Sequence, residues 1–221
     1  MKNIVVLALF LLGQISFSQA SRDLDDFNKV KVFDRLNVEL IASKESKIII
    51  TGDRANEVEV VNINGELKLR MPLPKLLSGN DIKIKLYYKN IEFIDASEGS
   101  VVSSEELIKQ NSIDLNAKEG SEISLELDVD KVDVRAVTGA KIELVGKAKN
   151  QNITVATGAV LKADNLVTSQ TTIYVSSGAK ATVFATILVD AKADTGGIVT
   201  IFGKPKEINK TTSLGGKIKQ K

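Results

Sequence analysis

The sequence predicts an all-β protein: a right-handed parallel β-helix, or β-solenoid, with about 19–20 residues per repeat and an all-β N-terminal section. Two observations lead to this fold class. Glycines recur along the second half of the chain at gaps of 21, 19, 19, 20, 18 and 19 residues, and apolar residues alternate with polar residues on either side of each glycine. A period near twenty residues is too short for a helix-pair repeat and is typical of one turn of a β-solenoid. The corner glycines are Gly99, Gly120, Gly139, Gly158, Gly178, Gly196 and Gly215.

Each repeat reads as a strand, a turn at the glycine, and a second strand. Around Gly139, for example, the apolar residues are Val134 and Ala136 before the turn and Ile142 and Leu144 after it. A spacing of two residues puts these side chains on one face of a strand. Stacked repeats would therefore line a shared core with equivalent apolar columns, and parallel coils favour the right-handed crossing.

Mostly polar residues fill the intervening positions. Because such a position lies between apolar columns, we expect its side chains to point away from the core. Six residues before the glycine, successive repeats carry Phe93, Asp114, Asp133, Asn152, Thr172 and Asp190.

The glycines are flanked by small residues, as in Thr157-Gly158-Ala159. We expect the glycine to supply a corner with positive φ, which other residues would strain. The small residue after it indicates close stacking between corners, and a larger residue at position 158 would press on the corners at Gly139 and Gly178. A ladder of Thr and Ser side chains contacting a ligand is the alternative, but a structural corner is favoured.

The chain is divided into an N-terminal section and the repeats, within one domain spanning 20–221. Residues 20–90 are predicted to form strands or a cap, and residues 91–218 the solenoid. Asn64-Gly65 between two alternating segments predicts a tight hairpin. The section either caps the first turn, which protects an open sheet edge, or continues as irregular turns. No long helix is expected, and the segment 103–111, in the longest gap, is interpreted as a loop.

Residues 1–19 have the pattern of a secretory signal peptide, with Lys2 before an apolar run and small residues near the cleavage position. The run is too short to span a bilayer, and no transmembrane segment is expected in the mature chain. The chain has no cysteine, which excludes disulfides and lipoprotein attachment. These features predict export through the general secretory route to the periplasm, the cell surface or the medium, not as a lipoprotein.

Composition excludes several classes of function. Lys and Arg number 30 against 28 Asp and Glu, so no basic excess predicts nucleic-acid binding. The absence of histidine and cysteine excludes Ser-His-Asp and Cys-His catalysis, histidine metal ligands and thiolate zinc sites. No catalytic residue, cofactor site or metal site is therefore expected, and the corner glycines are assigned a structural role.

Carboxylates are the remaining route to catalysis, because β-helix enzymes that act on polysaccharides use acidic clusters. Asp114 and Asp133 occupy equivalent positions on adjacent repeats, which would place them about 5 Å apart, a separation suited to a retaining glycosidase. Asp128 and Asp130, with Lys131, are expected in the intervening loop. A solvated acidic face beside Lys118 and Arg135 explains the same residues without catalysis.

Aromatic platforms for sugars are scarce in this sequence. The chain has no tryptophan, and its three tyrosines are Tyr87, Tyr88 and Tyr174. These three are the candidates for contact with a sugar, and alternation places Tyr174 in an outward column of the repeats.

The order of these features is similar to that of a known bacterial family. The leader is followed by Gly52-Asp53, serial small-Gly-small corners, the segment 201–205 (Ile-Phe-Gly-Lys-Pro) and the segment 214–218 (Leu-Gly-Gly-Lys-Ile). Over about residues 26–218 the chain resembles the bacterial "putative auto-transporter adhesin, head GIN domain" family, common in Bacteroidota. The resemblance implies a β-helical fold and an exported location. The family usually has Ser-Gly at its corners. The first two corners of this chain have Glu98 and Glu119 before the glycine instead, so we expect these two corners to bend differently.

We therefore expect an exported, non-catalytic binding or adhesion-like module that presents a β-solenoid surface. Its partner would be a glycan or a cell-surface protein, and not a nucleic acid. A polysaccharide-active β-helix enzyme and a structural or envelope-stress component of the periplasm are the alternatives. The sequence leaves the ligand, the oligomeric state and the choice between periplasm and surface open.

Overall fold

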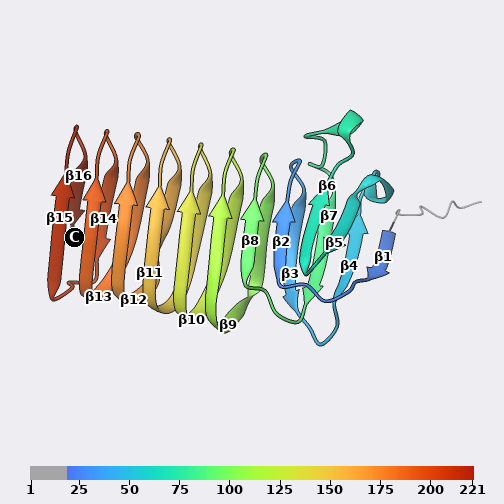
Figure 1. Ribbon diagram of the computed structural model, residues 1–221, viewed down its shortest axis with the longest axis horizontal. Coiled ribbons are helices and arrows are strands. Elements are labelled where there is room, and N and C mark those ends of the chain that lie inside the picture. Colours follow the sequence, from blue (N-terminus) through green and yellow to red (C-terminus); the bar gives the residue numbers. More distant parts are fainter. Residues whose placement is uncertain (1–18) are drawn as a thin grey trace, which may run out of the picture.

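The computed structural model describes residues 19–221, which form a stack of β-strand coils (Figure 1). Within these residues no α-helix is present, and two single turns of 3-10 helix occur, η1 (Ala55–Glu57) and η2 (Leu73–Lys75). The predicted signal peptide lies outside the described residues, apart from Gln19. The strands are β1 (Gln19–Asp23), β2 (Lys29–Val32), β3 (Asn37–Ala42), β4 (Lys47–Thr51), β5 (Glu59–Ile63), β6 (Glu66–Arg70), β7 (Lys83–Tyr88), β8 (Phe93–Ala96), β9 (Val101–Ala117), β10 (Glu122–Ala136), β11 (Lys141–Val155), β12 (Val160–Val175), β13 (Lys180–Ala193), β14 (Ile198–Phe202), β15 (Glu207–Thr212) and β16 (Lys217–Gln220).

The second half of the chain is a parallel β-solenoid, as the sequence predicts, and the stack has about 7 turns. Each of β9 to β13 is long enough to run through most of a turn, so it has a leading limb after one corner and a closing limb before the next. Neighbouring turns pair in parallel and in register. Ile142 pairs with Ile123 on one side and with Leu161 on the other, and all three side chains are buried.

The closing limbs stack into one sheet, and the leading limbs stack into the other, with the apolar core between them. We call the outer side of the first sheet the closing face. It is formed by the outward residues of segments 93–96, 114–117, 133–136, 152–155, 172–175 and 190–193. The outer side of the second sheet is the leading face.

The corners have the positive-φ backbone that the sequence predicts. At Thr138-Gly139 the two φ angles are 52° and 73°. The Gly139 amide donates to the carbonyl of Thr157 on the next corner over 3.0 Å, so the corners are hydrogen-bonded along the stack. Glu98 and Glu119 have φ of 55° and 56°, so the first two corners bend like the others, and the expected difference is wrong.

At the corners, the position with little space for a larger side chain is the residue after the glycine, not the glycine itself. A Cβ added at Gly158 would meet nothing within 4 Å, so the expected pressure on Gly139 and Gly178 is wrong, and only the φ of 70° demands glycine there. The following Ala159 is fully buried. In the equivalent position a Cβ added at Gly197 would lie 2.4 Å from a backbone oxygen, which confirms close stacking at this small residue.

The N-terminal section supplies further turns and also closes the end of the stack. β2 and β3 form one turn, which pairs in parallel with β8 and β9 on one side and with β6 and β7 on the other. β1, β4 and β5 add antiparallel strands at this end. Both alternatives left open by the sequence, irregular turns and a cap, are therefore present, and the Asn64-Gly65 hairpin between β5 and β6 is confirmed.

A corner without glycine connects β2 to β3. Asp34 and Arg35 have φ of 59° and 62°. The Arg35 amide donates to the carbonyl of Glu98 on the next corner over 3.0 Å, just as the corner glycines do further along. A repeat pattern built on glycine does not detect this turn.

The segment 103–111 is part of strand β9, so its interpretation as a loop is wrong. Its register against β10 shifts between Ser103 and Leu107, where three residues of β9 face one residue of β10. The extra residues that lengthen the gap to 21 therefore form a bulge inside a continuous strand.

Candidate binding groove on the closing face

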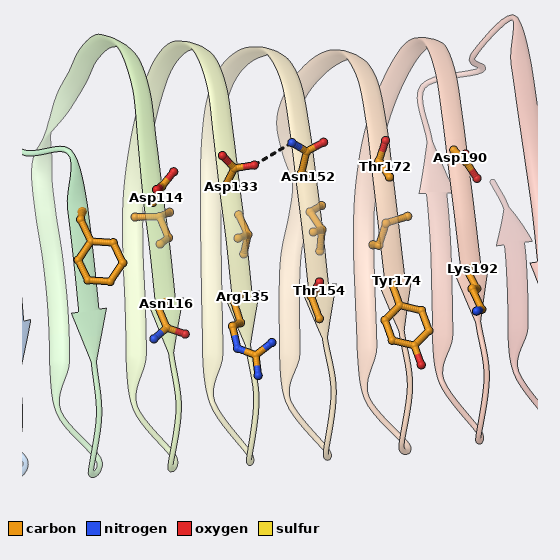
Figure 2. Close-up of a pocket in the computed structure, with 15 residues that line it drawn as sticks. Asp114, Asn116, Asp133, Arg135, Asn152, Thr154, Thr172, Tyr174, Asp190 and Lys192 are labelled. Carbon is orange, nitrogen blue, oxygen red and sulfur yellow. Dashed lines mark hydrogen bonds between the residues drawn. The ribbon is translucent and has the colours of Figure 1, made fainter.

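A groove of about 750 Å³ lies on the closing face and runs along the stack from Phe93 to Lys192 (Figure 2). Two parallel rows of outward side chains line it. The carboxylate row consists of Phe93, Asp114, Asp133, Asn152, Thr172 and Asp190. The mixed row consists of Asn116, Arg135, Thr154, Tyr174 and Lys192.

Parallel, in-register pairing produces the rows. Asp133 pairs directly with Asp114 on one neighbouring strand and with Asn152 on the other. The two rows are separated by one inward residue on each strand, such as the buried Val134. Equivalent positions therefore recur at the strand spacing of about 4.8 Å along the axis, with side chains pointing the same way.

Differences in side-chain length hollow the middle of the groove. Figure 2 shows the short side chains of Asn152 and Thr154 on the turn between the longer Arg135 and Tyr174, and the short Thr172 above Tyr174 on the same strand. A regular β-sheet surface with equal side chains would be flat, so the hollow depends on the choice of residues in these two rows.

The two aspartates of the predicted pair are adjacent, as the repeat register requires. Partial burial and the neighbouring Asp133 carboxylate raise the pKa of Asp114 above its ordinary value. Burial alone would also raise the pKa of Asp133, but hydrogen bonds from Lys131 and Asn152 hold it below its ordinary value. Asp133 accepts from Lys131 over 2.5 Å and from Asn152 over 2.7 Å, one bond to each carboxylate oxygen.

The mixed row carries the aromatic and cationic groups of the groove. The Tyr174 hydroxyl donates to Asp194 over 2.7 Å, which fixes the ring on the surface. The Lys192 ammonium lies 5.4 Å from the centroid of that ring, within the range of a cation–π contact. Tyr174 points outward as predicted, whereas Tyr88 is buried in the core and cannot serve as a sugar platform.

The other acidic candidates lie elsewhere. Asp128 and Asp130 lie inside strand β10, at the bend between its limbs, so the expected loop position is wrong. They pair with Lys109 over 3.6 Å and with Lys149 over 2.7 Å. None of the seven corner glycines lines the groove. The expected neighbour Lys118 pairs with Asp95 over 3.7 Å.

Sequence reasoning missed the mixed row as a unit. It named Arg135 and Tyr174 singly, but not Asn116, Thr154 and Lys192. The signal was available, because the position four residues before each corner glycine alternates outward just as the position six residues before it does. What the pattern does not contain is the hollow, which arises from side-chain lengths on neighbouring turns.

Within residues 19–221 no helix is long and apolar enough to cross a membrane. The fold and the site together define a parallel β-solenoid with a groove between two rows of mostly polar side chains on one face. The sequence matches the model of the family described as "Putative auto-transporter adhesin, head GIN domain" over residues 26–205, and the chain belongs to this family. No curated protein matches the sequence.

Three solved structures of similar shape come from Bacteroidales and are described as putative adhesins. One from Bacteroides fragilis is 18% identical, with a TM-score of 0.86 over 94% of this chain and 98% of that chain. One from Parabacteroides distasonis is 17% identical, with a TM-score of 0.78 over 93% and 97%. One from Parabacteroides merdae is 16% identical, with a TM-score of 0.75 over 95% and 98%. At these identities the likeness concerns the fold.

Proposed function

We propose that the chain is an exported, non-catalytic binding module that holds a glycan chain in the closing-face groove. The observation that carries this proposal is the pair of in-register polar rows. A chain ligand lying along the solenoid axis would meet hydrogen-bonding groups at each strand spacing, with the Tyr174 ring available for stacking. Membership of an adhesin-like family supports a binding role.

The charges of the groove favour a ligand of low net charge. Its lining includes three carboxylates, Asp114, Asp133 and Asp190, and two cations, Arg135 and Lys192. A polyanion would face the carboxylate row, and a polycation would face the mixed row. Sugar hydroxyls both donate and accept hydrogen bonds, so they can use carboxylates, amides and cations together.

The engagement of Asp133 supports binding over catalysis. Its two oxygens already accept hydrogen bonds from Lys131 and Asn152. A nucleophilic carboxylate needs a free oxygen directed at the sugar, and a retaining pair has to stand on opposite sides of the scissile bond. Asp114 and Asp133 instead lie side by side on one flat face.

One observation favours the enzyme alternative. The pKa of Asp114 is raised and that of Asp133 is lowered, and two carboxyls with pKa values pushed apart are typical of acid–base pairs. The opposite pKa shifts of Asp114 and Asp133 also follow without catalysis. Two neighbouring carboxyl groups do not ionise equally, and the hydrogen bonds to Asp133 favour its charged form.

Two measurements on the purified chain from residue 20 onward test the proposal. A glycan panel should contain ligands that the protein retains, and incubation with the same glycans should release no reducing or unsaturated ends. Release that disappears in Asp114→Asn or Asp133→Asn would establish the enzyme instead. A panel without any retained glycan would remove the proposed ligand class.

The proposed export is tested separately. Fractionation of producing cells should place the processed chain outside the cytoplasm, and surface labelling of intact cells would distinguish an adhesion role from a periplasmic one. Retention of the unprocessed chain in the cytoplasm would contradict this part of the proposal.

A further inference from the structure

The connection between β6 and β7 carries an exposed apolar tip. We call residues 71–80 the leucine loop; it contains η2 and projects beyond the corners at the N-terminal end of the stack (Figure 1). Leu73 is 84% exposed, Leu76 53% and Leu77 44%. Single exposed leucines are ordinary on protein surfaces, but three within five residues on a projecting loop form a patch that needs a partner.

The loop is held in place by a buried carboxylate. Asp34 is only 1% exposed, and its two oxygens accept hydrogen bonds from the backbone amides of Met71 and Leu77, each over 2.9 Å. The Asp34 carbonyl accepts a third bond from the Gly79 amide over 2.9 Å. Both ends of the loop are therefore fixed to the first corner of the solenoid, so the leucines project from a defined base.

The local structure keeps the tip apolar at a cost to stability. Leu77 has a φ of 58°, a left-handed conformation that is unfavourable for a leucine. A chain that only had to join β6 to β7 could place glycine or asparagine there without strain. The leucine contributes little to the core, because its side chain is 44% exposed and faces solvent.

Part of the loop backbone needs no hydrogen bond from water. Pro72 and Pro74 have no amide hydrogen to desolvate. The Lys75 amide donates to the Pro72 carbonyl over 2.8 Å, and Arg54 donates to the Ser78 carbonyl. Together with the bonds to Asp34, these contacts satisfy groups that would be costly to transfer from water into lipid.

The charges of the loop suit the surface of a bilayer. No acidic residue occurs between positions 71 and 80, and the single cation, Lys75, pairs with Glu57 over 2.5 Å. A carboxylate at the tip would oppose insertion, whereas the long side chain of Lys75 can keep its ammonium group at the headgroup level.

We propose that the leucine loop inserts into the surface of a phospholipid bilayer and attaches the solenoid to it weakly and reversibly. A convex apolar tip buries its side chains best in a fluid that closes around it, whereas a protein partner would need a matching pocket. The buried area is that of three leucines, so the attachment belongs with single-anchor membrane contacts that exchange readily. The groove begins at β8, on another turn, so both sites can be occupied together.

The absence of tryptophan from the chain permits a direct test. A Leu73→Trp variant gives one reporter at the tip, and Leu214→Trp gives the control, because Leu214 is 81% exposed on a corner at the opposite end of the stack. With vesicles of phosphatidylethanolamine and phosphatidylglycerol, the emission of the Leu73→Trp variant should shift to the blue and be quenched by lipids brominated on the acyl chains. The Leu214→Trp variant should show neither effect.

Three results would overturn the proposal. The first is an unchanged emission of the Leu73→Trp variant with vesicles, and the second is an equal shift of both variants. The third is a blue shift without vesicles that grows with protein concentration, which would assign the tip to contact between copies of the chain. Because the Lys75 charge is already paired, vesicle binding should not depend on attraction between charges. It should therefore survive about 0.5 M salt, which screens such attraction more strongly than about 0.1 M salt, where the Debye length is about 10 Å.

A flotation assay gives an independent readout. The triple variant Leu73→Ser, Leu76→Ser and Leu77→Asn should fold with an unchanged circular dichroism spectrum, because asparagine tolerates the left-handed φ better than leucine does. It should lose at least about tenfold in the fraction that floats with vesicles. Flotation equal to that of the unaltered chain, with the fold intact, would also contradict the proposal.

Discussion

The side-chain amide of Asn152 donates a hydrogen bond to Asp133 on the preceding turn of the solenoid, over 2.7 Å. The contact joins neighbouring positions of one row, because parallel strands in register bring equivalent residues side by side. The same relation brings Asp114 next to Asp133. The register that aligns apolar side chains in the core therefore also places polar side chains in contact on the surface. There, the pKa of Asp114 and that of Asp133 each depend on neighbouring residues of adjacent strands.

The register of the apolar columns predicts unequal costs for two adjacent substitutions. Ile142→Asp should lower the free energy of unfolding by several kcal/mol, because it places an unpaired carboxylate in a fully buried column. Lys141→Asp replaces an exposed ion pair with Glu122 by an exposed contact between two carboxylates and should cost about 1 kcal/mol. Urea denaturation of both variants measures the difference, and equal midpoint shifts would contradict the register.

The corner conformation predicts that glycine is required for its backbone and not for its size. Gly158→Val should destabilise the fold by about 1–3 kcal/mol, because a β-branched residue is strongly disfavoured at a φ of 70°. Gly158→Asn should cost clearly less, since asparagine tolerates this region and the space beside the glycine is open. If thermal melting shows the two variants to be equally damaged, crowding rather than backbone strain controls the corner.

The buried carboxylate at the first corner should be important for stability. Asp34→Asn leaves a single carbonyl oxygen and a donating NH₂ group for two backbone amides, so one amide of the leucine loop loses its acceptor. The expected loss is about 1–3 kcal/mol of unfolding free energy. The matched control is Asp190→Asn on the exposed carboxylate row, which should change stability by less than about 0.5 kcal/mol. Similar losses in both variants would remove the structural role assigned to Asp34.

The coupled aspartates predict a measurable titration. The pKa of Asp114 is raised by burial and by the Asp133 carboxylate, so Asp133→Asn should lower it toward the ordinary value. In the native protein the folded state holds the Asp114 proton more tightly than the unfolded chain does. The contribution of Asp114 to stability therefore falls as the pH rises through its folded pKa and is largest below the unfolded value of about 3.9. Carboxyl NMR titration of both proteins checks the direction, and an unchanged or higher pKa of Asp114 in the variant would refute the coupling.

Most of the solenoid could be predicted from the sequence, because its regularity is local. Alternation around Gly139 identifies the inward residues, and the constant gap sets their register, so the pairing of Ile123 with Ile142 follows without a structure. The order of the first turns could not be predicted. β2 and β3 insert between β6–β7 and β8–β9, and no local pattern encodes which strand pairs with which when the chain returns to an earlier turn.

The candidate site was predicted in part. The outward direction of Asp114 and Asp133 and their adjacency follow from the repeat, whereas the hydrogen bonds of Asp133 to Lys131 and Asn152 depend on side-chain geometry. The corner at Asp34-Arg35 was missed because two non-glycine residues adopt positive φ there, held by hydrogen bonds that a glycine pattern does not contain.

The most direct test of the proposed function compares the two faces of the solenoid by isothermal titration with a glycan retained in the panel. Arg135→Ala and Tyr174→Ala remove groups from the groove, and Lys162→Ala removes an exposed lysine from the leading face. All three side chains point outward, so melting temperatures should stay close to that of the unaltered chain. We predict that each groove variant weakens binding at least about tenfold, or about 1.4 kcal/mol, while Lys162→Ala binds normally. Equal affinity of all three variants, or loss confined to Lys162→Ala, would contradict the assignment of the closing-face groove as the binding site.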